Sequence, residues 1–269
     1  MIYVTGDTHT EPSRLSNKNF PEQAEMTKED YVVILGDFGL VFAAPDESRE
    51  EKYWLDWLEE RPFTMLFVDG NHENFDRLDA YPVEEWHGGK IQKIRPSVIH
   101  LMRGEIYDID GASVFTFGGA ASRDISGLAT EEELKANYAA GVLDSQAPDY
   151  KEKIRRLKSL KRETGSAPYR VFRETWWPQE MPSEEEMNRG LKNLEAHDSK
   201  VDFIFTHEAP SSVVAAGWPG EYKAYRFSQY LEEVRQKTQY HTWFFGHYHK
   251  NRQITDKDIC VYKQVARIW

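Results

Sequence analysis

Short apolar runs that alternate with helix-like segments constrain the fold of this chain most strongly. Each run is rich in β-branched or aromatic residues, which is typical of buried strands. The expected strands cover 2–5, 31–35, 65–68, 98–101, 114–117, 201–205, 242–245 and 259–262. The expected helices cover 47–60, 75–80, 131–140, 183–196 and 226–237. Strands interleaved with helices indicate an α/β domain.

Two parts of the chain depart from this alternation. The segment 98–117 predicts consecutive strands, because turn signals stand at Arg103-Gly104 and Asp110-Gly111, so we expect a mixed sheet. The segment of about 121–200 is rich in charge and helix formers and contains no convincing strand. We predict one domain over 1–269, with 121–200 as an insertion or a cap over a site. A surface excursion explains the same composition equally well.

The charge balance argues against long-range attraction to polyanions. Lys and Arg number 34 against 45 Asp and Glu, a net charge of −11, whereas nucleic acids and anionic membranes are bound by neutralising phosphates. The N-terminus shows no signal-peptide pattern, and no stretch approaches the ~20 apolar residues of a membrane span. The single cysteine, Cys260, cannot form an intramolecular disulfide, which fits a reducing compartment. We therefore expect a cytoplasmic protein without a membrane partner.

Side chains that can bind metals follow several of the expected strands. They are Asp7 and His9, Asp37, Asn71 and His72, His207, and His247 and His249. In an open α/β sheet the carboxyl ends of the strands line one crevice, so groups distant in sequence converge there. A lone histidine after a strand is usually an ordinary hydrogen-bonded residue, but five of the nine histidines stand at such positions. The pattern predicts one shared site.

The donor types indicate which metals this site would take. Carboxylate, amide oxygen and imidazole ligands without thiolate suit Zn²⁺, Mn²⁺, Fe or Ni²⁺ better than Ca²⁺ or an iron–sulfur cluster. The absence of cysteine ligands also disfavours a closed structural zinc site.

The order of these motifs resembles the calcineurin-like metallophosphoesterases. The shared motifs are Asp-x-His at 7–9, Gly-Asp at 36–37, Gly-Asn-His-Glu at 70–73, a late histidine at 207 and Gly-His-x-His at 246–249. The resemblance implies a four-layer α-β-β-α sandwich of two mixed sheets that binds two divalent ions, with Mn²⁺ expected before Fe, Zn²⁺ or Ni²⁺. It implies a first metal held by Asp7, His9, Asp37 and His249. It implies a second metal held by Asp37, Asn71, His207 and His247.

The same resemblance assigns roles in catalysis. Asp37 would bridge the ions, and metal-bound hydroxide would attack phosphorus directly, without a covalent enzyme intermediate. Asn71 and His72 would meet the substrate, and His72 would donate a proton to the leaving oxygen. Glu73 either orients His72 or is a surface carboxylate. Two ions supply about +4 against −2 from Asp7 and Asp37, so the pocket attracts phosphate although the chain is acidic.

The chain departs from the phosphoserine and phosphothreonine phosphatases of this family. Those enzymes carry Gly-Asp-x-Val-Asp-Arg-Gly as the second motif and an arginine just before Gly-Asn-His-Glu, whereas this chain reads Gly-Asp-Phe-Gly-Leu-Val-Phe at 36–42, ending in Phe42, and has Asp69. Arginine grips phosphate through paired hydrogen bonds, which neither residue makes. Phosphate binding must then involve other residues, and the loop 118–124 with Arg123 is the candidate. A surface salt bridge between Arg123 and Asp124 is the equal alternative.

We expect a metal-dependent phosphoric ester hydrolase, a phosphatase or phosphodiesterase, acting on a small nucleotide-like or other phosphorylated metabolite. A nuclease is the first alternative, because the basic run 151–162 could touch a phosphate backbone and Trp176 and Trp177 could stack on bases. A solvated helix face and simple packing are the competing interpretations of those two features. A serine/threonine protein phosphatase is a further alternative, but this chain lacks the two motif arginines with which those enzymes bind phosphate. A metal-bound scaffold without turnover would have no need of His72.

Overall fold

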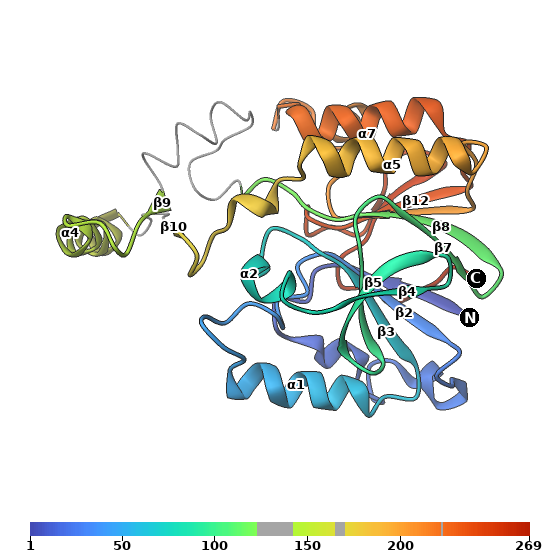
Figure 1. The fold of residues 1–269 in the computed structure, drawn as a ribbon, viewed down its shortest axis with the longest axis horizontal. Coiled ribbons are helices and arrows are strands. Elements are labelled where there is room, and N and C mark those ends of the chain that lie inside the picture. Colours follow the sequence, from blue (N-terminus) through green and yellow to red (C-terminus); the bar gives the residue numbers. More distant parts are fainter. Residues whose placement is uncertain (123–141, 165–169, 222) are drawn as a thin grey trace.

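The computed structural model describes residues 1–122, 142–164, 170–221 and 223–269. Two β-sheets lie face to face at its centre, and helices cover the outer face of each sheet (Figure 1). This is the expected α/β architecture with helix, sheet, sheet and helix layers.

The first sheet has seven strands in the order β15-β1-β2-β3-β6-β5-β4. They are β1 (Ile2–Thr5), β2 (Tyr31–Leu35), β3 (Thr64–Val68), β4 (Val83–Trp86), β5 (Gly89–Arg95), β6 (Val98–Leu101) and β15 (Ala266–Arg267). β1, β2, β3 and β6 are parallel, whereas β15, β5 and β4 pair antiparallel, so the sheet is mixed. Every residue of β1, β2 and β3 is buried, as expected for parallel strands covered on both faces.

The second sheet has six strands in the order β13-β14-β12-β11-β8-β7. They are β7 (Glu105–Ile109), β8 (Ala112–Phe117), β11 (Phe203–Thr206), β12 (Thr242–Phe245), β13 (Arg252–Gln253) and β14 (Asp258–Cys260). β8, β11, β12 and β14 are parallel, and the two edge strands are antiparallel. The β7–β8 hairpin turns at Asp110-Gly111, where both residues have positive φ, as a tight hairpin turn requires.

The core is built in three layers of apolar contacts. Val33 of the first sheet and Phe205 of the second belong to one buried cluster between the sheets. Helix α1 (Arg49–Glu59) packs Leu55 on the outside of the first sheet. Helices α5 (Glu184–Ala196) and α7 (Arg226–Lys237) cover the outside of the second sheet. Each fully buried aliphatic or aromatic side chain contributes about 1.5–3 kcal/mol to stability.

Short helices and capped helix ends fix the loops between these layers. The Ser183 and Glu186 side chains form the predicted capping box at the start of α5. Ser48 and Glu51 form another at the start of α1, and each box satisfies helix N–H groups that would otherwise lack partners. The shorter helical segments among the described residues are η1 (Pro12–Leu15), η2 (Pro21–Glu25), α2 (Phe75–Leu78), η4 (Pro178–Glu180) and α6 (Ser211–Gly217).

The segment 121–200 combines two different environments. Helix α5 packs against the second sheet, whereas α4 (Tyr150–Thr164) lies to the side of the sheets (Figure 1). The expectation of no strand here was wrong, because β9 (Val142–Leu143) and β10 (Arg170–Val171) pair in parallel. The helix expected at 131–140 lies outside the described residues. The single domain with an insertion or cap at about 121–200 stays a prediction.

Within the described ranges, no helix combines the length and the apolar character needed to cross a membrane.

Candidate metal centre

The expected ligands come from loops at the carboxyl ends of strands in both sheets. Asp7 and His9 follow β1, Asp37 follows β2, Asn71 and His72 follow β3, His207 follows β11, and His247 and His249 follow β12. Because β1, β2 and β3 are parallel and in register, as are β11 and β12, these ends lie at one edge of each sheet.

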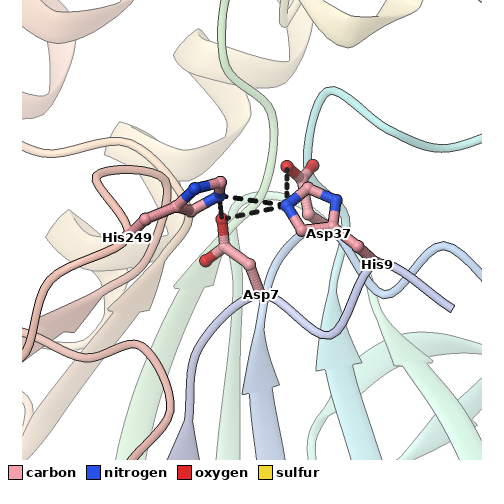
Figure 2. A group of neighbouring side chains, drawn as sticks. All are labelled: Asp7, His9, Asp37 and His249. Carbon is pink, nitrogen blue, oxygen red and sulfur yellow. Dashed lines mark hydrogen bonds and ion pairs between the residues drawn. The ribbon is translucent and has the colours of Figure 1, made fainter. Parts of the chain in front are cut away.

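The four side chains that the resemblance assigns to the first metal lie together and could hold an ion. One ligand atom from each of Asp7, His9, Asp37 and His249 lies within 4.8 Å of all the others. The ring nitrogens His9 Nε2 and His249 Nε2 are 3.0 Å apart, and His249 Nε2 is 3.0 Å from Asp7 Oδ2. Figure 2 shows the four side chains converging from the loops that follow β1, β2 and β12.

A second group adjoins the first across Asp37. His207 Nε2 lies 3.3 Å from Asp37 Oδ1 and 3.2 Å from Asn71 Oδ1. The other ring nitrogen, Nδ1, donates to the Leu35 carbonyl at 2.8 Å, and this bond turns Nε2 toward the two oxygens. The His247 ring is 4.9 Å from the His207 ring between centroids. Asp37 therefore presents Oδ1 to this group and Oδ2 to His9, 3.7 Å away.

The ligands sit on backbone that side chains rarely adopt. His9, Asp37, His247 and His249 all have φ between 44° and 66°. Such residues cost on the order of 1–3 kcal/mol each and cluster at functional sites. The concentration of strained, non-glycine residues at the strand ends supports a functional site.

Two glycines make the close packing of this centre possible. A Cβ atom at Gly36 would lie 2.1 Å from His207 Nδ1, and φ at Gly36 is +88°. A Cβ atom at Gly70 would lie 2.1 Å from Asp37 Oδ1. Both motifs thus need glycine for space, and the Gly-Asp motif needs it for conformation as well.

The charged groups of the centre hold one another in their ionised forms. Burial works to raise the pKa of the Asp37 carboxyl, but positive charge on His207 and His72 holds that pKa well below its usual range. Burial works to lower the pKa of His207, but Asp37 and Asp7 raise it to about 10. The carboxylates therefore stay anionic and attract positive charge to the space between the ligands.

The residues fit divalent ions. Asp7 Oδ2 is buried and has no hydrogen-bond donor of good geometry, and such an oxygen is costly unless a cation neutralises it. The donors around it are imidazole nitrogens and carboxylate oxygens, a set that suits Mn²⁺, Fe, Zn²⁺ and Ni²⁺. Asp7, His9, Asp37 and His249 would hold one ion.

His72 borders the centre without joining either group. Its ring lies 5.1 Å from the His9 ring between centroids, and its backbone N–H donates to Asp37 Oδ1 at 2.9 Å. Arg170 Nη2 lies 3.4 Å from His72 Nε2. The second candidate substrate-binding residue, Arg123, lies outside the described residues.

Glu73 has a role that neither sequence interpretation gave it. Its side chain is fully buried and accepts hydrogen bonds from the backbone N–H groups of Phe38 and Gly39, at 2.8 and 3.3 Å. It therefore fixes the loop that carries Asp37, and it is neither a surface carboxylate nor a partner of His72. The motif placed Glu73 beside the site, but only the fold shows which backbone it holds.

Asp69 and His100 form a buried pair that the sequence did not indicate. Asp69 Oδ2 accepts from Arg103 Nη2 at 2.5 Å, and Asp69 Oδ1 lies 3.1 Å from His100 Nε2. Burial works to raise the pKa of Asp69, but the Arg103 charge keeps it lowered. The residue that replaces the phosphatase arginine is therefore turned into the protein.

The two tryptophans pack the chain rather than offering stacking faces. Trp177 is 1% exposed, and its Nε1 donates to Asp76 Oδ2 at 2.9 Å. Trp176 is buried with Val142 and Phe172. The packing interpretation is confirmed, and these side chains are not available to bases.

Comparison with known families agrees with this geometry. The sequence model of the calcineurin-like phosphoesterase family matches residues 1–251 of the chain. The chain belongs to the calcineurin-like phosphoesterase family, whose members are metal-dependent phosphoester hydrolases. A search among curated proteins found no similar sequence.

Proposed function

We propose that this protein hydrolyses a phosphomonoester or phosphodiester with two divalent ions, by direct attack of water on phosphorus. The substrate class we propose is a small nucleotide-like or other phosphorylated metabolite. The observation that carries this proposal is the position of Asp37, whose two oxygens face two adjoining groups of ligands. Mn²⁺ is the first candidate, with Fe, Zn²⁺ and Ni²⁺ as alternatives.

The protein side chains would divide the work around the ions. Asp37 would bridge two ions, with Asp7, His9 and His249 on one side. On the other side the ligands would be Asn71, His207 and His247. A pair of ions in this position supplies phosphate neutralisation and lowers the pKa of water.

His72 would complete the reaction from outside the ligand shell. Protonated His72 donates a proton to the leaving oxygen, an effect typically worth about 10²–10⁴-fold. Its backbone N–H donates to Asp37 Oδ1, so the backbone of His72 is held beside the carboxylate that would bridge the ions. Asn71 would contact both a metal and the substrate.

The mouth of the site argues for a substrate other than a phosphoprotein. Val41 stands where the phosphatases have an arginine, and the ring of the next residue, Phe42, lies 6.1 Å from the His72 ring and 5.9 Å from the Trp177 ring between centroids. This apolar wall makes no bidentate contact with phosphate.

A nuclease remains the second candidate on the strength of helix α4. Lys151, Lys153, Arg155, Lys158 and Arg162 are exposed along it, and basic helices bind phosphate backbones. The net charge of −11 and the burial of both tryptophans weaken this candidate. Cleavage of single-stranded DNA or RNA at low salt, lost at higher salt, would support it.

The test is hydrolysis of p-nitrophenyl phosphate and its bis ester by protein reconstituted with Mn²⁺. We expect turnover of at least one ester, and we expect His72→Ala to lower kcat about 10²-fold or more while the metal content stays unchanged. His241→Ala is the matched control, because the His241 side chain is exposed and its Nδ1 lies 3.5 Å from Asp202 Oδ1. A wild type that is inactive on both esters with several metals would instead favour a scaffold.

A further inference from the structure

Arg170 is brought to the candidate site from a distant part of the chain. It lies on β10, which pairs with β9, and its Nη2 is 3.4 Å from His72 Nε2. The position of His72 beside the ligands therefore places a guanidinium at the edge where the leaving group would depart. No sequence pattern indicated this contact, because Arg170 stands in a charged segment 98 residues from His72.

The turn after Arg170 is closed by several backbone bonds. The carbonyl of Val171 accepts from the N–H groups of Glu174, Thr175 and Trp176, at 3.1, 2.8 and 3.1 Å. The Val171 N–H donates to Thr175 Oγ1 at 2.8 Å. These bonds fix the direction in which β10 enters the turn.

The chain beyond the turn is anchored in the body of the protein. Trp177 is buried and bonded to Asp76. Arg103 Nη2 donates to the Gln179 carbonyl at 2.8 Å, and the buried Glu180 accepts two hydrogen bonds from Ser122, at 2.7 and 2.6 Å. Arg170 is thus carried on a segment whose position is set by buried contacts.

Two other arginines lie near the ligand loops and hold protein groups there. Arg14 donates to the carbonyls of Asp7 and Gly6, at 2.8 and 3.2 Å, and so holds the first ligand loop. Arg103 is buried against Asp69. Neither guanidinium replaces the arginines that phosphoprotein phosphatases use for phosphate, whereas Arg170 stands beside the expected proton donor.

We propose that Arg170 is a substrate-binding residue that contacts a terminal phosphate oxygen and makes phosphomonoesters the preferred substrates. The inference rests on the proposed function. A monoester keeps an extra charged terminal oxygen where a diester carries a second carbon group, so a guanidinium favours the monoester. The oxygen would lie within reach of both Arg170 and His72.

The first test measures binding without turnover. Isothermal titration of inorganic phosphate into the Mn²⁺-loaded protein gives its affinity, and Arg170→Ala is expected to weaken it about 10–100-fold, as for loss of a charged hydrogen bond. Arg170→Lys should recover only part of the affinity, because lysine lacks the planar fork. Arg173→Ala is the control, because it also removes one positive charge from this turn. Arg173 Nη1 lies 3.7 Å from Asp76 Oδ1, and we expect the variant to keep the wild-type affinity for phosphate.

The second test measures selectivity. For Arg170→Ala, kcat/KM for p-nitrophenyl phosphate should fall about 10–100-fold, while the value for the bis ester changes less than about threefold. Unchanged phosphate affinity together with an unchanged monoester-to-diester ratio would overturn the role of Arg170 and leave the proposed function standing. Absence of phosphate binding by the wild type would also overturn it. Arg170-dependent phosphate binding by a wild type that hydrolyses no ester would support the anion site and contradict the proposed function.

Discussion

Asp37 shows how much of the site is readable from single residues. The Gly-Asp pattern after an apolar run predicted a carboxylate at a strand end, and the structure places that carboxylate between His9 and His207. The residue that holds its loop, Glu73, was recognised as part of the motif, but its bonds to Phe38 and Gly39 were not. A side chain's bond to backbone elsewhere in the chain depends on loop geometry that the sequence pattern does not contain.

Replacing Asp37 alone tests whether this residue bridges the two ions. We expect Asp37→Asn to lose both ions, because a neutral amide contributes no charge to either ligand group. Elemental analysis after dialysis measures the metal content per chain. The exposed Asp256 provides the control, and Asp256→Asn should retain the wild-type content. Full occupancy in Asp37→Asn would refute the bridging assignment.

At the scale of elements, the predicted strands that carry ligands were found because they are short apolar runs buried on both faces. The expected 2–5, 31–35 and 242–245 have the observed bounds of β1, β2 and β12. The segment that brings Arg170 and Glu180 to the site was not predictable in this way. Its β10 has two residues, too few to show a period, and its contacts with Ser122 and His72 are long-range.

Glu180 gives this segment a measurable pH dependence. Burial raises the pKa of Glu180 to about 8, although bonds from Ser122 oppose the shift. The folded state therefore holds a proton that the unfolded state releases above about pH 4.5, so the contribution of Glu180 to stability falls as pH rises from about 4.5 to 8. The glutamine side chain of Glu180→Gln does not ionise, so this variant should not lose stability in this way as the pH rises.

Urea unfolding in the presence of a chelator measures this effect. Relative to wild type, we expect Glu180→Gln to gain on the order of 2–4 kcal/mol in unfolding free energy between pH 5 and pH 8.5. Glu174→Gln is the control, because Glu174 is exposed in the same segment and should show the wild-type profile. Parallel profiles for wild type and Glu180→Gln would contradict the raised pKa.

At the level of the whole molecule, the expected metal ligands come from both sheets. Asp7, Asp37 and Asn71 follow strands of the first sheet, whereas His207 and His249 follow strands of the second. The layered fold was predicted through the family resemblance, since the local pattern indicated only an α/β domain with a mixed sheet. The two sheets pack through apolar residues that are far apart in sequence. The strands carry similar apolar residues, so the local pattern does not show which strands form which sheet.

Metal binding should therefore stabilise the whole fold. A ligand that binds only the native state adds about 2.7 kcal/mol at 100 times its Kd, which for a chain of this size raises Tm by about 5–10 °C. Scanning calorimetry with Mn²⁺ and with EDTA measures the difference. An equal Tm in both conditions would contradict a centre that links the sheets.

The proposed reaction requires two cations among these side chains. Anomalous diffraction from crystals grown with Mn²⁺ tests it most directly. Two anomalous peaks separated by about 3.5–4 Å, with Asp37 between them and His72 outside the ligand shell, are the predicted result. A single peak away from Asp37, or no peak among these residues, would contradict the account.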